Sequence, residues 1–275
     1  MLARAITNLL RELPVLGATC PSNYVSMGMP PNWPNQASAA VSLTFEGATA
    51  RHLDVAQMLT DLGLCATFYA YPPNLLDDPR AWLRASRNGH ELGNHALFGA
   101  VDDGGLLIRM SREAIEEEIE DGRMLLEAEF GVKAHSAAMP MVRTHHGESG
   151  FPTVSEVVRR TTVRINNDQL GPVLRARYDV IRSPLDHFNT VDTLSTEVGC
   201  FQAEGLDAVS VCLMLQVGIS QGNWTVLSFG PDCDLPTLRQ IAGWLTRQSV
   251  CVAPVVEVGR CLAGSNAPSP SLKQP

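Results

Sequence analysis

The chain has 275 residues, of which 45% are hydrophobic and 18% charged, and its net charge is -8. This length and composition are in the range of a single globular α/β domain, whose core is large enough to fold without disulfide bonds or a structural metal ion. The acidic balance, and the lack of any window that combines Lys and Arg with aromatic residues, argue against nucleic acid as a partner. The seven cysteines are odd in number and contain no C-x-x-C pair, so we expect reduced, mostly buried thiols.

Residues 1–38 form an N-terminal arm in our interpretation. A short helix is expected over Leu2–Leu13, and a passage rich in Pro, Asn and Ser follows, in which repeated prolines exclude a helix. The arm either wraps the domain or reaches a partner, including a second copy of the chain in a homo-oligomer. Charged residues interrupt its apolar run, unlike in a signal peptide, and the longest apolar stretch, Val209–Ile219, is too short to cross a bilayer. We therefore expect a cytoplasmic protein with no membrane partner.

From residue 39 to residue 262, predicted strands alternate with predicted helices. The first strand is the alternating apolar run Ala39–Phe45, and later strands are expected at 66–71, in the segment that ends at 95, and at 133–139, 161–165, 178–182, 225–229 and 250–255. Helices are expected at 51–63, 79–88, from Ser111 to Gly131, and at 153–160, 206–221 and 235–248. This alternation predicts an α/β fold, a parallel sheet covered by helices that closes into a barrel. The tail, residues 263–275, is rich in Ser, Pro and Asn and is expected to be disordered.

Two residues with catalytic side chains lie where predicted strands end. Glu46 follows the first strand, and His95 ends the segment Gly-His-Glu-Leu-Gly-Asn-His at residues 89–95. Parallel β/α proteins place their chemistry at the carboxyl ends of the strands, because the loops there converge. We therefore expect Glu46 and His95 at the same edge of the sheet.

Three motifs in this region resemble the polysaccharide deacetylases, the NodB-like carbohydrate esterases. They are Val-Ser-Leu-Thr-Phe-Glu-Gly at 41–47, Leu-Cys-Ala-Thr-Phe-Tyr at 64–69, and the segment at 89–95. Weaker similarity extends over about residues 39–262. The resemblance implies a deformed (β/α) barrel and a hydrolase of non-peptide C-N bonds that acts on a carbohydrate or a small amide.

The resemblance also implies roles for particular residues. In the family, one Asp is the general base, and a second Asp with two His residues holds a divalent metal such as zinc. Residue by residue, Glu46 takes the place of the base, Gly47 that of the metal-binding Asp, His95 that of the first His, and Gly99 that of the second. Of the three metal ligands of the family, only His95 remains, so the metal site is incomplete. Glu46 is a second possible ligand if it does not act as the base.

Other histidines are weaker candidates. Asp186 and His187 are adjacent, and we predict for them an accessory role as an orienting acid and a general acid. His90 is expected to be a framework residue of its motif. His145 and His146 are neighbours in the sequence, so their side chains diverge and do not readily share one metal ion.

Three functions remain open from the sequence. The chain is a C-N hydrolase with an atypical site, or a pseudoenzyme that binds a glycan or small molecule in the old cleft, or an interaction subunit that docks through its N-terminal arm. The two glycines, Gly47 and Gly99, favour the second function, because glycine removes a ligand and opens space. Retention of Glu46 and His95 favours the first.

Overall fold

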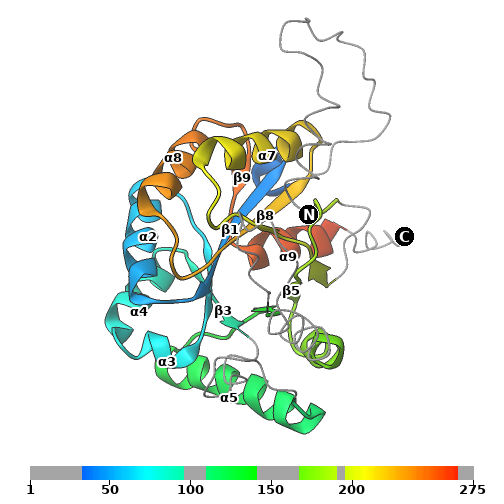
Figure 1. Cartoon of the computed structure of the whole chain (residues 1–275). Helices are drawn as coiled ribbons and strands as arrows, with labels where there is room; N and C mark the ends of the chain where they lie inside the picture. The colour runs from blue at the N-terminus through cyan, green and yellow to red at the C-terminus, as the bar shows by residue number, and fades with distance from the viewer. Residues whose placement is uncertain (1–32, 96–109, 141–166, 191–195, 266–275) are drawn as a thin grey trace, which may run out of the picture.

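The strands of this protein form one curved sheet. The structure, a computed structural model, describes residues 33–95, 110–140, 167–190 and 196–265. In these ranges the sheet has nine strands, ordered β6-β5-β4-β3-β2-β1-β8-β7, with β9 also paired to β1. The strands are β1 (Ala40–Gly47), β2 (Thr67–Ala70), β3 (Glu91–His95), β4 (Ser136–Ala138), β5 (Val180–Arg182), β6 (Glu197–Val198), β7 (Phe201–Gln202), β8 (Trp224–Phe229) and β9 (Cys251–Val252). Every pair of these strands is parallel (Figure 1).

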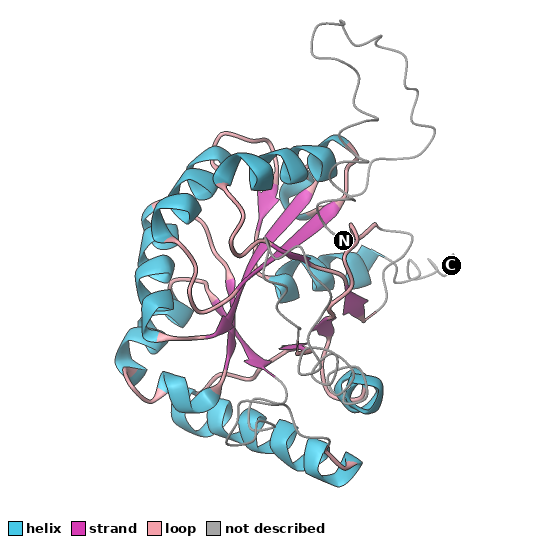
Figure 2. Cartoon of the chain, viewed as in Figure 1, coloured by secondary structure: helices cyan, strands magenta, loops and turns pink. Residues whose placement is uncertain are grey.

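The curvature follows from the order of the strands. The two ends of the sheet are β6 and β7, and Val198 at the end of β6 is only three residues before Phe201 at the start of β7. Three residues span at most about 11 Å, so the sheet has to curl back toward itself. Figure 2 shows this curled half-barrel, with helices along its outer side. The predicted deformed (β/α) barrel is confirmed.

The described helices are α2 (Ala50–Asp61), α3 (Pro72–Leu75), α4 (Pro79–Arg87), α5 (Arg112–Phe130), α7 (Ala208–Ser220), α8 (Leu235–Leu245) and α9 (Val255–Ser265), with the short 3-10 helix η1 (Pro34–Gln36). Helices α2, α4, α5, α7 and α8 end within three residues of the predicted bounds, whereas α3 and α9 were not predicted. The Ser111 side chain caps α5 by accepting a hydrogen bond from the Ala114 backbone N–H, and Gly131 ends the helix at a φ of 60°. The expected strand 161–165 and helix 153–160 lie outside the described residues, and residues 167–175 are helical.

The closing segment differs from the prediction. The expected strand 250–255 is limited to Cys251–Val252, and helix α9 starts at Val255. The β-branched residues there favour a strand locally, but buried side chains of other strands bind the first N–H groups of the helix. Val255 N donates to Thr67 Oγ1 (2.9 Å) and Val256 N donates to Glu91 Oε2 (3.2 Å). The helix thus begins at the amino ends of β2 and β3.

The boundaries of the expected domain are only partly within the described residues. Helix α9 continues to Ser265, three residues into the expected tail, and the rest of that tail lies outside the description. Most of the arm does too, so the division at residues 38 and 262 stays a prediction. In the described ranges no helix has the length and apolar character needed to cross a membrane.

The core fixes the strand that carries Glu46. Phe45, the residue before it, is buried between Phe68 of β2 and Phe229 of β8, with ring centroids 5.0 and 5.3 Å away. Because side chains alternate along a strand, Phe45 on the helix-covered face directs Glu46 to the opposite face, inside the curve of the sheet.

Candidate functional site

The site is built from the carboxyl ends of three parallel strands. Glu46 is the second-last residue of β1, Arg182 is the last residue of β5, and Ser228 is the second-last residue of β8. Parallel strands place these ends at one edge of the sheet. Arg182 is 136 positions from Glu46 in the sequence and Ser228 is 182 positions from it, and the three side chains meet at this edge.

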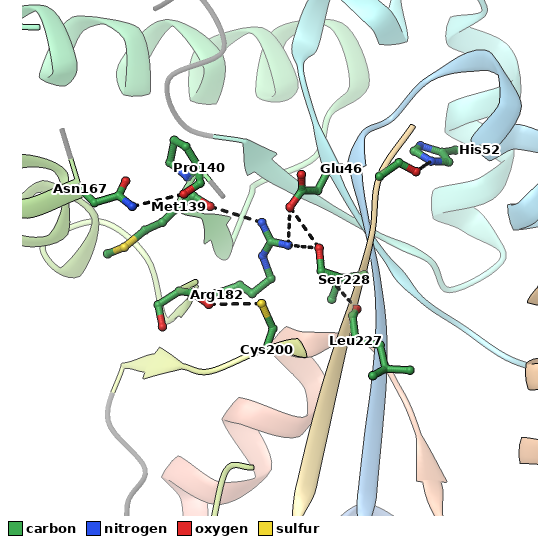
Figure 3. Close-up of polar contacts among 12 residues, drawn as sticks. Glu46, His52, Met139, Pro140, Asn167, Arg182, Cys200, Leu227 and Ser228 are labelled. Atoms are coloured by element: carbon green, nitrogen blue, oxygen red, sulfur yellow. Dashed lines mark hydrogen bonds and ion pairs between the residues drawn. The ribbon is translucent and has the colours of Figure 1, made fainter. Parts of the chain in front are cut away.

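Glu46 is held through one of its two carboxylate oxygens. Arg182 Nη1 donates to Glu46 Oε1 at 2.8 Å, and Ser228 Oγ donates to the same oxygen at 3.1 Å. In Figure 3 the second oxygen of Glu46 points away from the guanidinium. The Glu46 side chain is 13% exposed, whereas that of Arg182 is fully buried. The geometry fixes the carboxylate and leaves one oxygen directed out of the ion pair.

Arg182 is itself held in place from several sides. Its Nη1 also donates to Ser228 Oγ, its Nη2 donates to the Met139 carbonyl at 3.4 Å, and its Cζ lies 5.1 Å from the centre of the Tyr69 ring (Figure 3). Such a ring attracts a cation through its negative face. A buried charge is stable only when it is paired and hydrogen-bonded, and Arg182 is so held through Nη1 and Nη2, while its buried Nε has no hydrogen-bond partner in the described part of the chain.

Electrostatics keep Glu46 ionised. Burial by itself raises the pKa of this carboxyl, but the charges of Arg182 and His95, with the hydrogen bonds from Arg182 and Ser228, hold the pKa below its ordinary value. Burial by itself lowers the pKa of Arg182, but the charge and hydrogen bond of Glu46, together with other neighbours, outweigh this, so the pKa is raised. The pair is therefore charged on both sides at neutral pH.

His95 lies close to this pair. It is the last residue of β3, is 8% exposed, and in its protonated form lowers the pKa of Glu46. It also lines a small cavity of about 180 Å³ together with Asn94, Tyr71 and the α5 residues Glu118 and Asp121. As expected, Glu46 and His95 lie at the carboxyl ends of parallel strands of one sheet; their strands, β1 and β3, are separated by β2 and are not neighbours.

Comparisons with known proteins identify the family of one part of the chain. The sequence model of the polysaccharide deacetylase family matches residues 34–146. These residues belong to the polysaccharide deacetylase family. The match contains both Glu46 and His95.

Solved structures of similar fold cover nearly the whole chain. Two are described as polysaccharide deacetylases: one from Mycobacterium smegmatis (14% identity, TM-score 0.60, 90% of this chain and 98% of that one) and one from Pseudomonas aeruginosa PAO1 (10% identity, TM-score 0.58, 90% and 98%). A third is the Puue allantoinase (10% identity, TM-score 0.59, 92% and 100%). At these identities the likeness shows the fold. No curated protein sequence matches the chain.

The metal that the polysaccharide deacetylase family implies does not fit the donors described. Gly47 has no side chain to offer and has a φ of 91°, at which an Asp would be strained. Glu46 already binds the guanidinium of Arg182. A divalent metal ion bound to the same carboxylate would lie about 5–7 Å from the Arg182 charge, which would repel it by roughly 5–7 kcal/mol at an effective dielectric constant of ~20. Within residues 33–95, 110–140, 167–190 and 196–265, no three Cys, His, Asp or Glu side chains form a metal-binding group. Gly99 lies outside these ranges.

The remaining candidates are placed as follows. Asp186 and His187 are exposed in the turn after β5, and the His187 ring lies against Gly199, where a Cβ would come within 2.5 Å of it. Their accessory role stays a prediction. His90 is buried, and its ring nitrogens bind the Ala66 N–H (3.2 Å) and the Ala56 carbonyl (3.0 Å), contacts that suit a framework residue. His145 and His146 lie outside the described residues.

The sequence reasoning missed Arg182 and Ser228. Arg182 ends the run Val-Ile-Arg, which is part of a predicted buried strand. A cation in a buried strand needs an anionic partner, and this requirement is the sequence signal that could have identified Arg182 as a site residue. Ser228 lies in the late strand Val-Leu-Ser-Phe, and nothing in its sequence context distinguishes it from an ordinary core serine.

Proposed function

We propose that this polysaccharide deacetylase-like protein binds a carbohydrate or a small amide at the carboxyl edge of its sheet, and that it does so without a metal ion. The observation that carries the proposal is the fixed, ionised carboxylate of Glu46, bound by Arg182 and Ser228 through one oxygen only. With Oε1 held by these two donors, the other carboxylate oxygen can accept a hydrogen bond from a ligand in a fixed direction.

The chemistry of this acceptor defines the class of ligand. An ionised carboxylate accepts hydrogen bonds and donates none, so the ligand has to present hydroxyl or N–H groups. Sugars and amides carry both. A hydrogen bond to a charged group contributes about 1.5–3 kcal/mol, which corresponds to roughly a 10- to 150-fold change in affinity.

A second candidate function is metal-free hydrolysis of a non-peptide C-N bond. It is favoured by the position of Glu46 and His95 at the same edge of the sheet, at the carboxyl ends of β1 and β3. Glu46 would accept a proton from the water that attacks the carbonyl carbon, and His95 would stabilise the resulting oxyanion. The C-N bond would break as the oxyanion collapses to the carboxylic acid, and the proton on Glu46 would pass to the departing amine nitrogen. The lowered pKa of Glu46 makes it a weak base, so we place this function second.

Calorimetric titration of the chelator-treated protein with N-acetylated oligosaccharides and with small amides tests the proposal. We expect binding by the wild type, at least about tenfold weaker binding by Glu46→Gln, and unchanged binding by Glu129→Gln, which alters an exposed carboxyl on α5. Urea unfolding establishes that each variant is folded. Equal affinity of wild type and Glu46→Gln, or no binding of either ligand class, would contradict the proposal.

The same samples separate the two candidate functions. Release of acetate or ammonia by the chelator-treated wild type, lost in Glu46→Gln, would support hydrolysis. Binding without release supports a binding protein. A cytoplasmic location stays a prediction from the sequence.

A further inference from the structure

Helix α7 exposes two large apolar side chains on the face turned away from the sheet. Its sequence, Ala-Val-Ser-Val-Cys-Leu-Met-Leu-Gln-Val-Gly-Ile-Ser, contains no charged residue. One face packs against the sheet and buries Val211, Met214 and Leu215. The opposite face exposes Val209 (69%) and Leu213 (47%), two of the five large apolar side chains exposed in the described part of the chain. An outer helix of a globular domain normally presents charged and polar residues to water, so this face is typical of a covered surface.

The exposed face of α7 forms one wall of a groove. The other wall is α8, and the groove has a volume of about 570 Å³. Its α8 side includes the large apolar side chain of Trp244. We call this the α7–α8 groove.

The N-terminal arm enters the described structure near the C-terminal end of α7. Trp33, its first described residue, is buried; its indole N–H donates to the Gly222 carbonyl at 2.9 Å, and its ring packs edge-on against Trp224. Gly222 lies just beyond the last residue of α7, Ser220. At about 1.5 Å per residue, the α7 residues that line the groove, 208–216, lie roughly 9–21 Å along the helix axis from Gly222.

The segment upstream of this anchor has the pattern that the groove requires. Within Leu2–Leu13, the apolar residues recur with helical spacing, and they are Leu2, Ile6, Leu9, Leu10 and Leu13. At about 100° per residue, Arg4 and Arg11 fall on the opposite side, away from the arginines of the groove, Arg239 and Arg247. A helix over this segment is about 18 Å long, close to the length of α7. The chain between 14 and 32 spans up to about 60 Å, far more than the distance it has to cover.

From these observations we infer that residues 2–13 form an amphipathic helix that occupies the α7–α8 groove of the same chain. Its apolar stripe covers Val209 and Leu213. The inference is independent of what binds at Glu46.

Hydrogen–deuterium exchange of the full chain, read out by mass spectrometry, tests the inference. We expect the amides of residues 2–13 to exchange roughly tenfold or more slowly than in an unstructured peptide of the same sequence. Leu213→Asp should abolish this protection, because it places a charge under the apolar stripe. The matched control is Met124→Asp on α5, since Met124 is a helical apolar side chain of equal exposure, 48%, outside the groove. Protection of 2–13 should persist in the control.

Three results would overturn the inference. They are full-rate exchange of residues 2–13 in the wild type, protection that survives Leu213→Asp, and protection that depends on protein concentration together with a solution mass of two chains. The last result would show that a second copy supplies the segment. The double variant Ile6→Asp/Leu9→Asp tests the same contact from the other side, in case Leu213→Asp disturbs the folding of α7. It changes no residue of the described body and should also abolish the protection of residues 2–13.

Discussion

Replacement of Arg182 by Met is the perturbation that most directly tests the ion pair at the centre of the site. Met fills part of the volume but leaves Glu46 buried without the cation that is 2.8 Å away in the wild type. Removing one partner of a buried pair costs about 3–5 kcal/mol, because the other charge stays desolvated. For a domain of this size, we expect a decrease in melting temperature of roughly 6–20 °C.

The pH dependence of this loss has a definite sign. In the wild type the pKa of Glu46 is lowered, so its contribution to stability is present above the ordinary pKa of 4.5 and is lost as the pH falls through the folded value. In Arg182→Met, burial acts without the main opposing charge and raises the pKa of Glu46. The variant then loses stability as the pH rises above about 4.5. The difference in unfolding free energy between the two proteins should therefore be larger at pH 8 than at pH 4.5.

Urea unfolding of the wild type, Arg182→Met, Glu46→Gln and the double variant measures these quantities. We expect the double variant to lose less stability than the sum of the single losses, by about 0.5–3 kcal/mol, because it leaves no unpaired charge. The control is Arg123→Met on α5, which breaks partly exposed ion pairs with Glu120 and Glu127 and should cost no more than about 1 kcal/mol. A cost of Arg182→Met as small as that of the control, or a pH trend of opposite sign, would refute the reasoning.

Three further predictions concern the same framework. Ser228→Ala removes one donor to Glu46 and one acceptor from the guanidinium, so we expect a loss of about 1–3 kcal/mol in urea unfolding; a loss below 0.5 kcal/mol would contradict the hydrogen bonds. Gly218→Ala places a Cβ 2.2 Å from a threonine hydroxyl on β8 and should lower the free energy of unfolding by about 1–3 kcal/mol. Its control, Gly243→Ala, is also in a helix, but the added Cβ has no contact closer than 3.9 Å, so the free energy of unfolding should stay unchanged or rise by up to about 1 kcal/mol. Equal effects of the two substitutions would contradict the packing of α7 on the sheet. Burial raises the pKa of Glu91, so its contribution to stability is complete below pH 4.5 and decreases as the pH rises; Glu91→Gln should therefore be less destabilising at pH 8 than at pH 4.5, and the reverse order would contradict this.

The sheet edge that carries Glu46 and His95 could be predicted from the sequence because its signals are local. The alternation through Phe45 defines a strand, and its break defines where the carboxylate emerges. The cap residues of α5, Ser111 and Gly131, are local signals of the same kind. Each depends on a few neighbouring residues, so no knowledge of the fold is needed.

The rest of the site depends on contacts across the sheet. Glu46 and Arg182 are 136 positions apart, and only the strand order β5-β4-β3-β2-β1, with the curvature of the sheet, brings them together. Helix α9 was missed for the same reason. Its β-branched start predicts a strand, and the contacts that favour a helix come from Thr67 and Glu91, more than 160 positions away.

A zinc titration of the chelator-treated protein by calorimetry tests the central claim, that the site acts without a metal ion. It is run on the wild type and on His95→Ala and Glu46→Gln, which remove the two described side chains that the family resemblance places at the site. We predict no tight, stoichiometric binding in the wild type and no difference between the three proteins. Tight binding of about one zinc equivalent by the wild type, lost in His95→Ala, would contradict the account and show that a metal centre is assembled around His95.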